Sequence, residues 1–416
     1  MTHYGVTPSR CRHCGGALEH TFCDLGMSPL ANSYRTVENQ TATEAFYPLH
    51  VFVCGTCFLV QLPEAESPEG IFSDYAYFSS YSQSWLAHAE AYTSHMTARL
   101  GLDAASQVVE IASNDGYLLQ YFVERQIPVL GIEPAANVAR VAQDKGIPTR
   151  VAFFGADTAR SLRAEAVHAD LLLGNNVLAH VPDLHDFVEG MKILLEPEGV
   201  ITMEFPHLLR LMQQTQFDTI YHEHFSYFSF LAVEKVFAAH GLRLFDVAQL
   251  PTHGGSLRIF AAHESAATHP VSSSVAALHA EEIAAGLDDL STYSDFSERV
   301  KRIKRSLLRF LIDARDRGET VVGYGAPAKG VTLLNYCGVR TDLLDYTVDL
   351  SPHKQGKMLP GVHIPIESPD RIRETRPDYL LILPWNLKDE IMQQMAHIRT
   401  WGGAFVVPIP DLEILL

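Results

Sequence analysis

The segment Tyr221–Phe230 concentrates side chains that can do acid and base chemistry. It reads Tyr-His-Glu-His-Phe-Ser-Tyr-Phe-Ser-Phe, so two imidazoles, one carboxylate and two phenols share one aromatic stretch. A buried polar group needs a hydrogen-bond partner or a task, because leaving it unpaired costs about 1–3 kcal/mol. We therefore expect either a reactive site or a set of hydrogen-bonded structural groups here, and periodicity does not separate the two.

Four of the six cysteines form two pairs of equal spacing, Cys11-x-x-Cys14 and Cys54-x-x-Cys57. Each pair can bring two thiolates to one ion from a tight turn, and two such turns complete a tetrahedral Cys₄ site for Zn²⁺. Four protein ligands leave no open position, so the predicted zinc is structural. Reduced core cysteines or a redox pair are the alternatives. Cys23 and Cys337 are expected to be small buried hydrophobic residues.

Charge and hydropathy exclude several classes of partner. The 416 residues carry 32 Lys+Arg against 49 Asp+Glu, a formal net charge of −17, which repels phosphate backbones and argues against nucleic acid. No apolar run approaches the roughly 18 residues of a membrane span, and the start of the chain lacks the apolar stretch of a secretory signal. We expect a soluble cytoplasmic protein without a membrane partner, and the sequence leaves its oligomeric state open, a monomer included.

Alternation of short apolar runs with helical stretches predicts an α/β fold of several domains. The first domain, residues 1–66, holds the cysteine pairs and one strand at 47–53, and it ends at a polar Pro/Gly break. Residues 67–270 form a helical lead-in and a doubly wound domain. Residues 271–416 form a helical connector and a second Rossmann-like domain. The aromatic segment 71–81 is expected to be a pocket wall or a plug between domains.

Within the central domain a strand leads into a turn of small residues, Ala112–Gly116, and then into a helix. Such a turn lets backbone amides approach a ligand at the switch point of the sheet. The G-x-G-x-x-G fingerprint of dinucleotide sites is absent. Glu133 ends the next predicted strand and is placed to hold both hydroxyls of a ribose. Together these features resemble the first motif of class I S-adenosylmethionine (SAM) methyltransferases, although the turn is poorer in glycine than is usual there.

That resemblance implies a role for each of several residues. The turn residues would lie under the methionine part of SAM, Glu133 would bind the ribose, Phe153 would flank the adenine, and the strand ending at Asn175 would face both cofactor and acceptor. The implied cofactor-binding residues are Ala112, Ser113, Asn114, Gly116, Glu133, Phe153 and Asn175.

The order of motifs along the whole chain resembles the sugar C-methyltransferases that act on nucleotide-linked keto-deoxysugars. Those motifs are the four cysteines, the SAM-type domain, the Tyr-His-Glu-His stretch and a final domain with Gly323-Tyr-Gly-Ala-Pro-Ala-Lys-Gly330. Within that family the resemblance is strongest to enzymes of antibiotic deoxysugar biosynthesis that methylate C3 of a dTDP-linked 3-amino-4-keto-2,3,6-trideoxyhexose.

The chemistry implied by the family needs a base, because carbon becomes a nucleophile only after losing a proton, and a 4-keto group acidifies the proton at C3. The resemblance assigns His224 as that base. Glu223 would tune its neighbours, Tyr221 and Tyr75 would donate near the keto oxygen or the amino group, and His180 would be a second base or a binding residue. Pairing of His222 with His224 as metal ligands is the weaker alternative.

The final domain is expected to hold the nucleotide end of the substrate, since its glycine-containing turn opens a helix whose amides favour a diphosphate. The loop 353–357 adds positive charge, or is a solvated surface loop. The expected substrate-binding residues are Tyr77, Asn176, Lys329, His353 and Lys357. Methyl transfer to oxygen or nitrogen of a sugar nucleotide, or a non-catalytic nucleotide-binding or zinc scaffold, are the rival functions.

Overall fold

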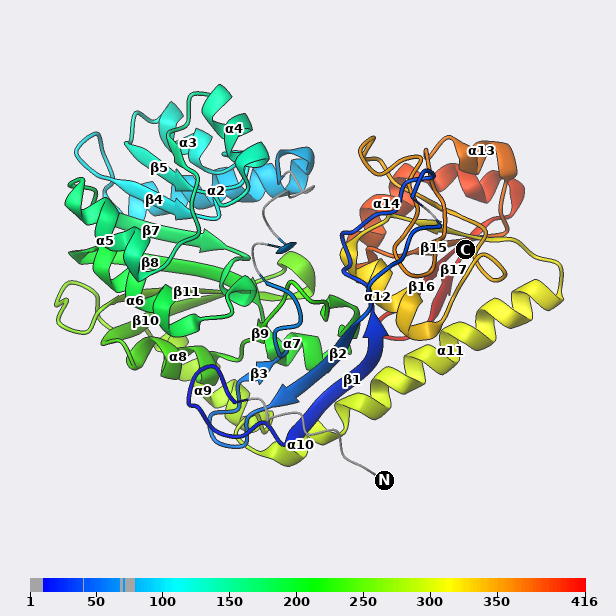
Figure 1. The fold of residues 1–416 in the computed structure, drawn as a ribbon, viewed down its shortest axis with the longest axis horizontal. Coiled ribbons are helices and arrows are strands. Elements are labelled where there is room, and N and C mark those ends of the chain that lie inside the picture. The colour runs from blue at the N-terminus through cyan, green and yellow to red at the C-terminus, as the bar shows by residue number, and fades with distance from the viewer. Residues whose placement is uncertain (1–9, 40, 68–69, 72–78) are drawn as a thin grey trace. The chain divides into compact units, whose positions relative to one another are not determined.

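A computed structural model describes residues 10–39, 41–67, 70–71 and 79–416. The chain forms two compact units, each built from three stretches of sequence (Figure 1). Unit 1 comprises residues up to 19, 54–208 and 225–289, and unit 2 comprises 20–53, 209–224 and 290–416. The segment 1–66 is thus divided between the units, and the domain boundaries drawn from the sequence stay a prediction.

Unit 1 is organised around a seven-stranded sheet with the order β10-β11-β8-β7-β4-β5-β6. The strands from β6 to β8 are parallel, β11 is antiparallel to β8, and β10 is antiparallel to β11. The strands are β4 Val108–Ile111, β5 Val129–Ile132, β6 Thr149–Arg150, β7 Ala169–Asn175, β8 Leu195–Pro206, β10 Leu242–Leu250 and β11 Ser256–His263. The predicted doubly wound sheet is confirmed, and β10 and β11 add an antiparallel hairpin at one edge.

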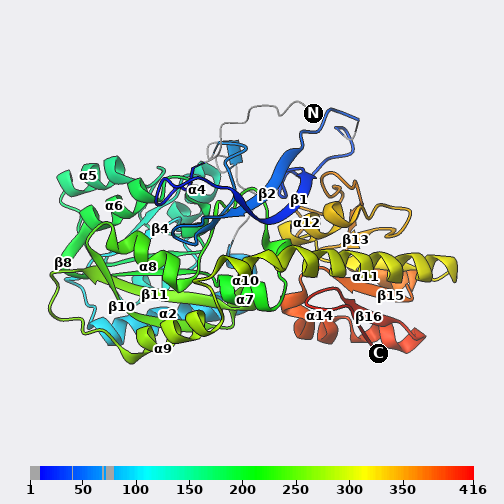
Figure 2. The ribbon, with the colours of Figure 1, turned by 90° about the horizontal axis from the view of Figure 1, so that it is seen from below.

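Helices cover both faces of this sheet, which is why β4 is buried at all four positions. The helices of unit 1 are α2 Gln83–Leu100, α3 Leu119–Glu124, α4 Ala136–Asp144, α5 Ala156–Ala164, α6 Leu184–Leu194, α8 Phe230–Ala238 and α9 Ser273–Ala284, with the 3₁₀ turns η1 Ser79–Tyr81, η2 Leu178–His180 and η4 Thr252–Gly254. Figure 2 shows α5, α6 and α8 on one side of the strands and α2 and α9 on the other.

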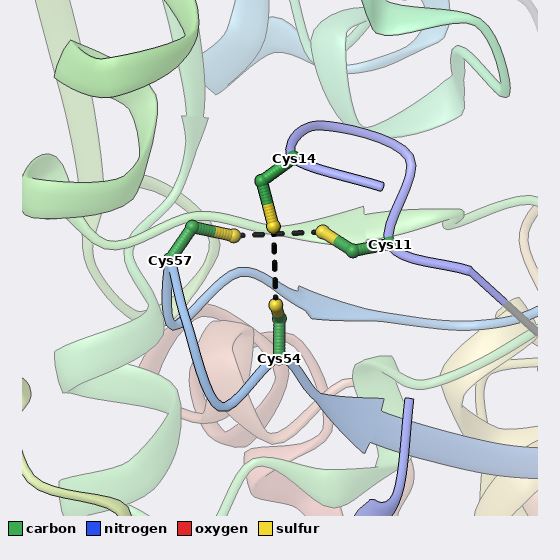
Figure 3. Close-up of side chains that lie close together, drawn as sticks. All are labelled: Cys11, Cys14, Cys54 and Cys57. Atoms are coloured by element: carbon green, nitrogen blue, oxygen red, sulfur yellow. Dashed lines mark hydrogen bonds between the residues drawn. The ribbon is translucent and has the colours of Figure 1, made fainter. Parts of the chain in front are cut away.

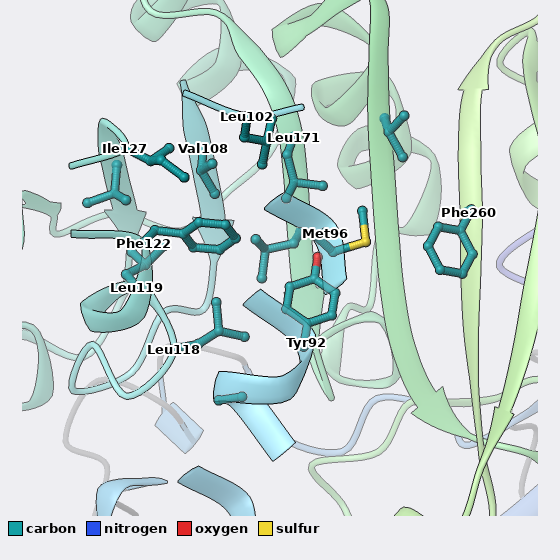
Figure 4. Close-up of a cluster of buried hydrophobic side chains, with 14 of the residues drawn as sticks. Tyr92, Met96, Leu102, Val108, Leu118, Leu119, Phe122, Ile127, Leu171 and Phe260 are labelled. Carbon is teal, nitrogen blue, oxygen red and sulfur yellow. The ribbon is translucent and has the colours of Figure 1, made fainter. Parts of the chain in front are cut away.

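The core of unit 1 lies between α2, α3 and the sheet (Figure 4). Tyr92 and Met96 of α2 pack with Phe122 of α3 and with Val108 and Leu171 of the central strands, all almost fully buried. Ser82 caps the start of α2 by accepting a hydrogen bond from the amide of Trp85, and the left-handed Gly101 ends the helix. These local signals define α2, and the predicted helical lead-in to the doubly wound domain is confirmed.

A short pair of strands, β3 Val60–Gln61 and β9 Ser226–Tyr227, completes unit 1. The antiparallel strands β1 His20–Ser28 and β2 Tyr47–Val53 belong to unit 2. Phe22 of β1 stacks on Phe296 of the long helix α11 Phe296–Asp316, with ring centroids 4.4 Å apart. The predicted strand at 47–53 is confirmed.

The second sheet, in unit 2, has the order β14-β13-β12-β15-β16-β17 and is parallel except for β17. This confirms a second Rossmann-like region. Its strands are β12 Val321–Tyr324, β13 Thr347–Val348, β14 Ile366–Glu367, β15 Tyr379–Ile382, β16 Ala404–Val407 and β17 Glu413–Leu415. Besides α11, the helices of unit 2 are α7 Leu208–Gln213, η3 Phe217–Thr219, α10 Leu290–Ser294, α12 Ala328–Cys337, α13 Arg371–Thr375, η5 Trp385–Leu387, α14 Lys388–Gln394 and η6 Ala396–Trp401. The first residue of α7, Leu208, still belongs to unit 1.

Candidate functional site

The two cysteine pairs come together on two turns of the same geometry (Figure 3). In the first turn the amide of Cys11 donates to Gly16 O and the amide of Gly15 donates to Cys11 O. In the second, Cys54 donates to Leu59 O and Phe58 donates to Cys54 O. Gly15 and Phe58 occupy equivalent positions and are both left-handed, with φ of 73° and 64°. Glycine meets this demand without strain, and the second turn meets it with a phenylalanine.

The arrangement of the sulfur atoms fits a tetrahedral metal ion. All four sulfur atoms lie within 4.8 Å of one another. A tetrahedral zinc ion with Zn–S bonds of about 2.3 Å holds its sulfur ligands about 3.8 Å apart, so only small shifts would close the cluster around an ion. The hydrogen bond between Cys11 and Cys57 lowers the pKa of the Cys11 thiol and raises the pKa of the Cys57 thiol. Cys11, Cys14, Cys54 and Cys57 therefore form the predicted structural zinc site. Cys23 and Cys337 are buried outside it, as expected.

In the turn after β4, three residues adopt left-handed backbone conformations. The φ angles of Ala112, Asn114 and Gly116 are 56°, 50° and 76°. A Cβ on Gly116 would lie 2.3 Å from Ile147 Cδ1, so only glycine fits there. Non-glycine residues in this region are strained, and such strain gathers at ligand sites. The turn keeps the tight path of a ligand-binding loop although it has only one glycine.

Glu133 follows β5, and two hydrogen bonds fix its side chain beside this turn. Its Oε2 accepts a hydrogen bond from the amide of Asn114 at 3.0 Å, and its Oε1 accepts one from the amide of Ala135 at 2.9 Å. Burial raises the pKa of this carboxyl group. Each oxygen retains a second lone pair, so the fixed carboxylate can still accept from ribose hydroxyls.

Buried polar atoms without partners gather around the same turn. Both carboxyl oxygens of Glu110, the hydroxyl of Ser113 and Oδ1 of Asp115 are buried and find no hydrogen-bond partner among the described residues. Burial, followed by the negative charges of Glu133 and Asp115, raises the pKa of Glu110 well above its usual value. Buried acceptor atoms without described partners at one turn favour a ligand that donates hydrogen bonds, and SAM carries an ammonium group and two ribose hydroxyls. The residues present fit SAM.

The ends of β6 and β7 bring further side chains to the same edge of the sheet. Asn175 ends β7 and its Nδ2 lies 3.3 Å from the hydroxyl of Tyr117. Asn176 follows with a left-handed φ of 54°, and His180 closes the turn η2. Phe153 lies after β6, with 38% of its surface exposed. The sequence-based assignments to this edge thus fall on loops that follow parallel strands.

A network around Glu204 of β8 was not identified from the sequence. His88 Nε2 and Arg258 Nη2 lie 2.9 and 2.6 Å from Glu204 Oε2, and the hydroxyl of Thr252 donates to Oε1 at 3.0 Å. Burial raises the pKa of Glu204, but the bonds and charges from His88 and Arg258 outweigh it and lower the pKa to about 2. These residues are far apart in sequence, and only the pairing of β8 with β11 brings Glu204 opposite Arg258.

In unit 2, the ring of His224 is held by the main chain. His224 Nδ1 lies 2.7 Å from Thr219 O, and a carbonyl oxygen can only accept, so Nδ1 carries the proton and Nε2 carries the basic lone pair of the neutral ring. The ring of Tyr221 packs against it with centroids 4.0 Å apart. His222 points elsewhere, with Nε2 3.2 Å from Pro48 O, and burial lowers its pKa.

Glu223 is 5% exposed and is anchored from the connection between β1 and β2. Its Oε1 accepts a hydrogen bond from Asn32 Nδ2 at 2.6 Å. Two residues further on, the hydroxyl of Tyr34 donates to the carbonyl of Ala326 at 2.6 Å, in the turn before α12. Residues 32–34 therefore join the Tyr-His-Glu-His segment to the glycine-containing turn of the second Rossmann-like region, a link that the sequence gives no sign of.

Lys329 lies at the start of α12, and its ammonium group already has partners. It donates to Asn386 Oδ1 at 2.7 Å and lies 4.8 Å from the centroid of the Trp385 ring. Trp385 Nε1 donates to Asp218 Oδ2 at 2.7 Å, and the other oxygen of this buried carboxyl group has no partner among the described residues. Burial raises the pKa of Asp218 to about 6, although the charge of Lys329 opposes the shift. Burial lowers the pKa of Lys329.

The loop with His353 and Lys357 follows β13. His353 is exposed, and Lys357 is half-buried. Between them, Lys354 donates to the carbonyl of Ala326 at 2.9 Å and lies 3.6 Å from Asp349. The loop is therefore tied to the turn before α12 by a lysine that the sequence did not single out. Tyr75 and Tyr77, expected near the substrate, fall outside the described residues.

The described residues also bear on metal binding and on membrane insertion. The four cysteines are the only group of three or more His, Cys, Asp or Glu side chains among the described residues that could hold a metal ion. No helix within the described ranges is long and apolar enough to cross a membrane.

Comparison with known proteins places this architecture. Three family models match in the predicted order: a zinc binding domain over residues 11–72, a methyltransferase domain over 85–247 and a C-methyltransferase C-terminal domain over 251–410. The C-methyltransferase NovU of Streptomyces niveus is 38% identical over 405 residues, which are 97% of this chain and 96% of NovU.

Solved structures are similar over less than half of the chain. The PH0226 protein of Pyrococcus horikoshii OT3 shares 15% identity, with a TM-score of 0.36 over 45% of this chain and 94% of that one. An S-adenosylmethionine-dependent methyltransferase of Clostridium acetobutylicum ATCC 824 shares 12% identity, with a TM-score of 0.34 over 42% and 90% of the two chains.

The match to a C-methyltransferase runs through both units of the fold, and the SAM-type turn and the four-cysteine site lie where the family order predicted them. The chain thus belongs to the family of SAM-dependent C-methyltransferases that combine a zinc-binding segment, a methyltransferase domain and a C-methyltransferase C-terminal domain.

Proposed function

We propose that the protein methylates C3 of a dTDP-linked 3-amino-4-keto-2,3,6-trideoxyhexose and that His224 is the base. The single observation that carries this proposal is the hydrogen bond from His224 Nδ1 to Thr219 O, because it directs the basic lone pair to Nε2 and fixes the ring. A neutral, oriented imidazole is the group that removal of a carbon-bound proton near pH 7 requires.

The step follows from ordinary carbonyl chemistry. His224 Nε2 takes the proton from C3, the electron pair of that C–H bond moves into the enolate, and negative charge develops on the keto oxygen at C4. The turn 112–116 and Glu133 would hold SAM, which would supply an electrophilic methyl group. The carbon at C3 forms the new C–C bond as the sulfonium S–C bond breaks, and the proton on His224 passes to solvent.

The remaining residues have supporting roles in this proposal. Tyr221 packs against His224 and would donate toward the keto oxygen, with Tyr75 as a second donor. Glu223, anchored by Asn32, would tune the polarity of the site. His180 and Asn176, at the end of β7, would contact the acceptor, together with Tyr77.

The nucleotide end of the substrate belongs in this proposal to the second Rossmann-like region. The start of α12 and the side chains of His353 and Lys357 are the groups that would meet the diphosphate. Lys329 is engaged with Asn386 and Trp385, so we expect it to act through the shape of this turn as well as through its charge.

Product analysis tests the acceptor and the methylated atom together. SAM labelled with ¹³C in its methyl group would be incubated with the amino-keto sugar nucleotide, with its 3-hydroxy analogue and with a sugar lacking the keto group. We expect label only with keto sugars, in a methyl group that carbon NMR assigns to a quaternary carbon at C3. Label on oxygen or nitrogen would replace the proposal with the rival methyltransferase.

A further inference from the structure

Asn176 and His253 form a polar pair, and the proposed function gives a role only to Asn176. Asn176 Nδ2 lies 3.1 Å from His253 Nε2, and an amide NH₂ group can only donate, so His253 Nε2 accepts. Both residues have a φ of 54°. The left-handed conformation is uncommon for residues other than glycine, and backbone strain of this kind gathers at functional sites.

The pair leaves one acceptor unsatisfied. Asn176 Oδ1 is buried and has no hydrogen-bond partner among the described residues. A buried carbonyl oxygen without a partner costs about 1–3 kcal/mol, so folding alone does not favour an asparagine here. A hydroxyl or ammonium group of a ligand would satisfy this oxygen.

Aromatic rings border the pair. His253 meets Trp85 edge to face at 5.2 Å, and Trp85 stacks with Tyr117 at 6.0 Å. Asn175 bonds to the hydroxyl of the same tyrosine. Rings of this kind beside a few fixed polar atoms are typical of small-molecule sites. Asn176 follows β7, and His253 lies in the turn η4 between β10 and β11.

Glu204 holds both members of the pair. Its main-chain oxygen accepts a hydrogen bond from the amide of Asn176 at 2.7 Å, and its side chain accepts one from the hydroxyl of Thr252, the residue before His253. His88 and Arg258 fix the other carboxyl oxygen. The main chain of Glu204 therefore holds Asn176, and its buried carboxylate holds Thr252 next to His253.

We infer that Asn176 and His253 form a subsite for a hydrogen-bond-donating group of the acceptor, a hydroxyl or an ammonium, and that Glu204 is the positioning residue of this subsite. The inference rests on the proposed function for the identity of the acceptor. It adds His253, Thr252 and the Glu204 network to the residues that determine acceptor binding.

Two substitutions test it. Thr252→Val keeps the size of the side chain but removes the hydrogen bond to Glu204, and Asn176→Gly removes the amide oxygen while tolerating the left-handed backbone. Calorimetry would measure the Kd of the amino-keto sugar nucleotide in the presence of S-adenosylhomocysteine, and the Kd of SAM separately. Loss of one buried hydrogen bond predicts a rise in sugar-nucleotide Kd of about tenfold, with the SAM Kd within about twofold.

Controls separate positioning from general damage. Thr252→Ser restores a hydroxyl and should recover most of the affinity. Thr268→Val removes an exposed threonine–glutamate hydrogen bond, to Glu198 elsewhere in unit 1, and should leave the sugar-nucleotide Kd unchanged. Steady-state kinetics should show the effect of Thr252→Val in KM more than in kcat.

Each outcome is decisive. A tenfold loss in both variants, recovered by Thr252→Ser, supports the subsite. Wild-type affinity for the sugar nucleotide in Thr252→Val and Asn176→Gly, with a wild-type enzyme that turns over, overturns the subsite and leaves the proposed function standing. A wild-type protein that neither binds nor methylates any keto-sugar nucleotide overturns the proposed function and the subsite with it.

Discussion

The imidazole of His224 donates a hydrogen bond from Nδ1 to the main-chain carbonyl oxygen of Thr219, 2.7 Å away. This bond assigns the tautomer of the neutral ring, because the carbonyl cannot donate. The turn that supplies the carbonyl is itself held by the second Rossmann-like region, since the hydroxyl of Thr332 donates to Ile220 O at 2.9 Å and Trp385 donates to Asp218. The proposed base therefore has a fixed orientation within unit 2.

Gly116→Ala should weaken SAM binding. An added Cβ would meet the end of the Ile147 side chain at 2.3 Å in a turn whose φ of 76° already disfavours alanine, so the turn or that side chain must move. We expect a rise in the SAM Kd of at least about tenfold by calorimetry. Gly101→Ala is the matched control, because its φ is 65° but nothing lies within 4 Å of the added carbon. An unchanged SAM Kd in Gly116→Ala would show that this turn does not hold the cofactor.

Cys54→Ser should remove zinc and destabilise the fold without a specific effect on catalysis. The sulfur of Cys54 is fully buried in the four-cysteine cluster, and a structural zinc contributes directly to folding free energy. We expect less than one zinc per chain by elemental analysis and a lower Tm, with kcat per folded molecule preserved. Cys337 is buried outside the cluster, so the Cys337→Ser protein should keep the zinc bound by the four cysteines. Zinc retained in Cys54→Ser would contradict the assignment.

Trp385→Phe should destabilise unit 2 through Asp218. The change keeps an aromatic ring beside Lys329 but removes the indole N–H that donates to Asp218 Oδ2. The buried carboxyl group of Asp218 thereby loses its hydrogen bond from residue 385. We expect a loss of about 1–3 kcal/mol in the free energy of unfolding, measured with urea. Trp401→Phe removes a bond to the carbonyl of Pro377 at a half-exposed site and should cost less. Equal losses in the two variants would argue against a special role for Asp218.

The same carboxyl group predicts a pH dependence of stability. Its pKa is raised from 3.8 to about 6 in the folded protein, chiefly by burial, so folding takes up a proton between these values. Its contribution is fully present below about pH 4 and is lost as the pH rises through about 6. Relative to Asp218→Asn, wild-type stability should therefore fall by at most about 3 kcal/mol between pH 4 and pH 7. If the free energies of unfolding of the two proteins changed in parallel with pH, the raised pKa of Asp218 would be refuted.

The sequence predicts the fold well because its signals are local. Helix α2 begins at a serine cap and ends at a glycine, and β4 is a buried apolar run followed by small residues. The zinc site is predictable for the same reason, since each turn is encoded within six residues, although Phe58 in place of a glycine hides the likeness of the second turn to the first.

The parts that the sequence does not reveal depend on contacts between distant segments. Asn32 meets Glu223 across 191 positions, and Trp385 meets Asp218 across 167. Glu204 and Arg258 look like ordinary strand residues until β8 and β11 pair. The division of residues 1–66 between two units is equally invisible, because only β1 and β2 packing with unit 2 creates it. Periodicity reports the element that a residue belongs to and not its partner.

Loss of deuterium from C3 of the sugar tests the central claim most directly. The keto-sugar nucleotide, deuterated at C3, would be incubated in H₂O with the wild-type protein and S-adenosylhomocysteine, which blocks transfer but not proton removal. We predict that mass spectrometry shows exchange of the label, and that His224→Asn slows it by about 10²–10⁴-fold while SAM affinity stays within about twofold. Exchange at the wild-type rate in His224→Asn would contradict the assignment of His224 as the base.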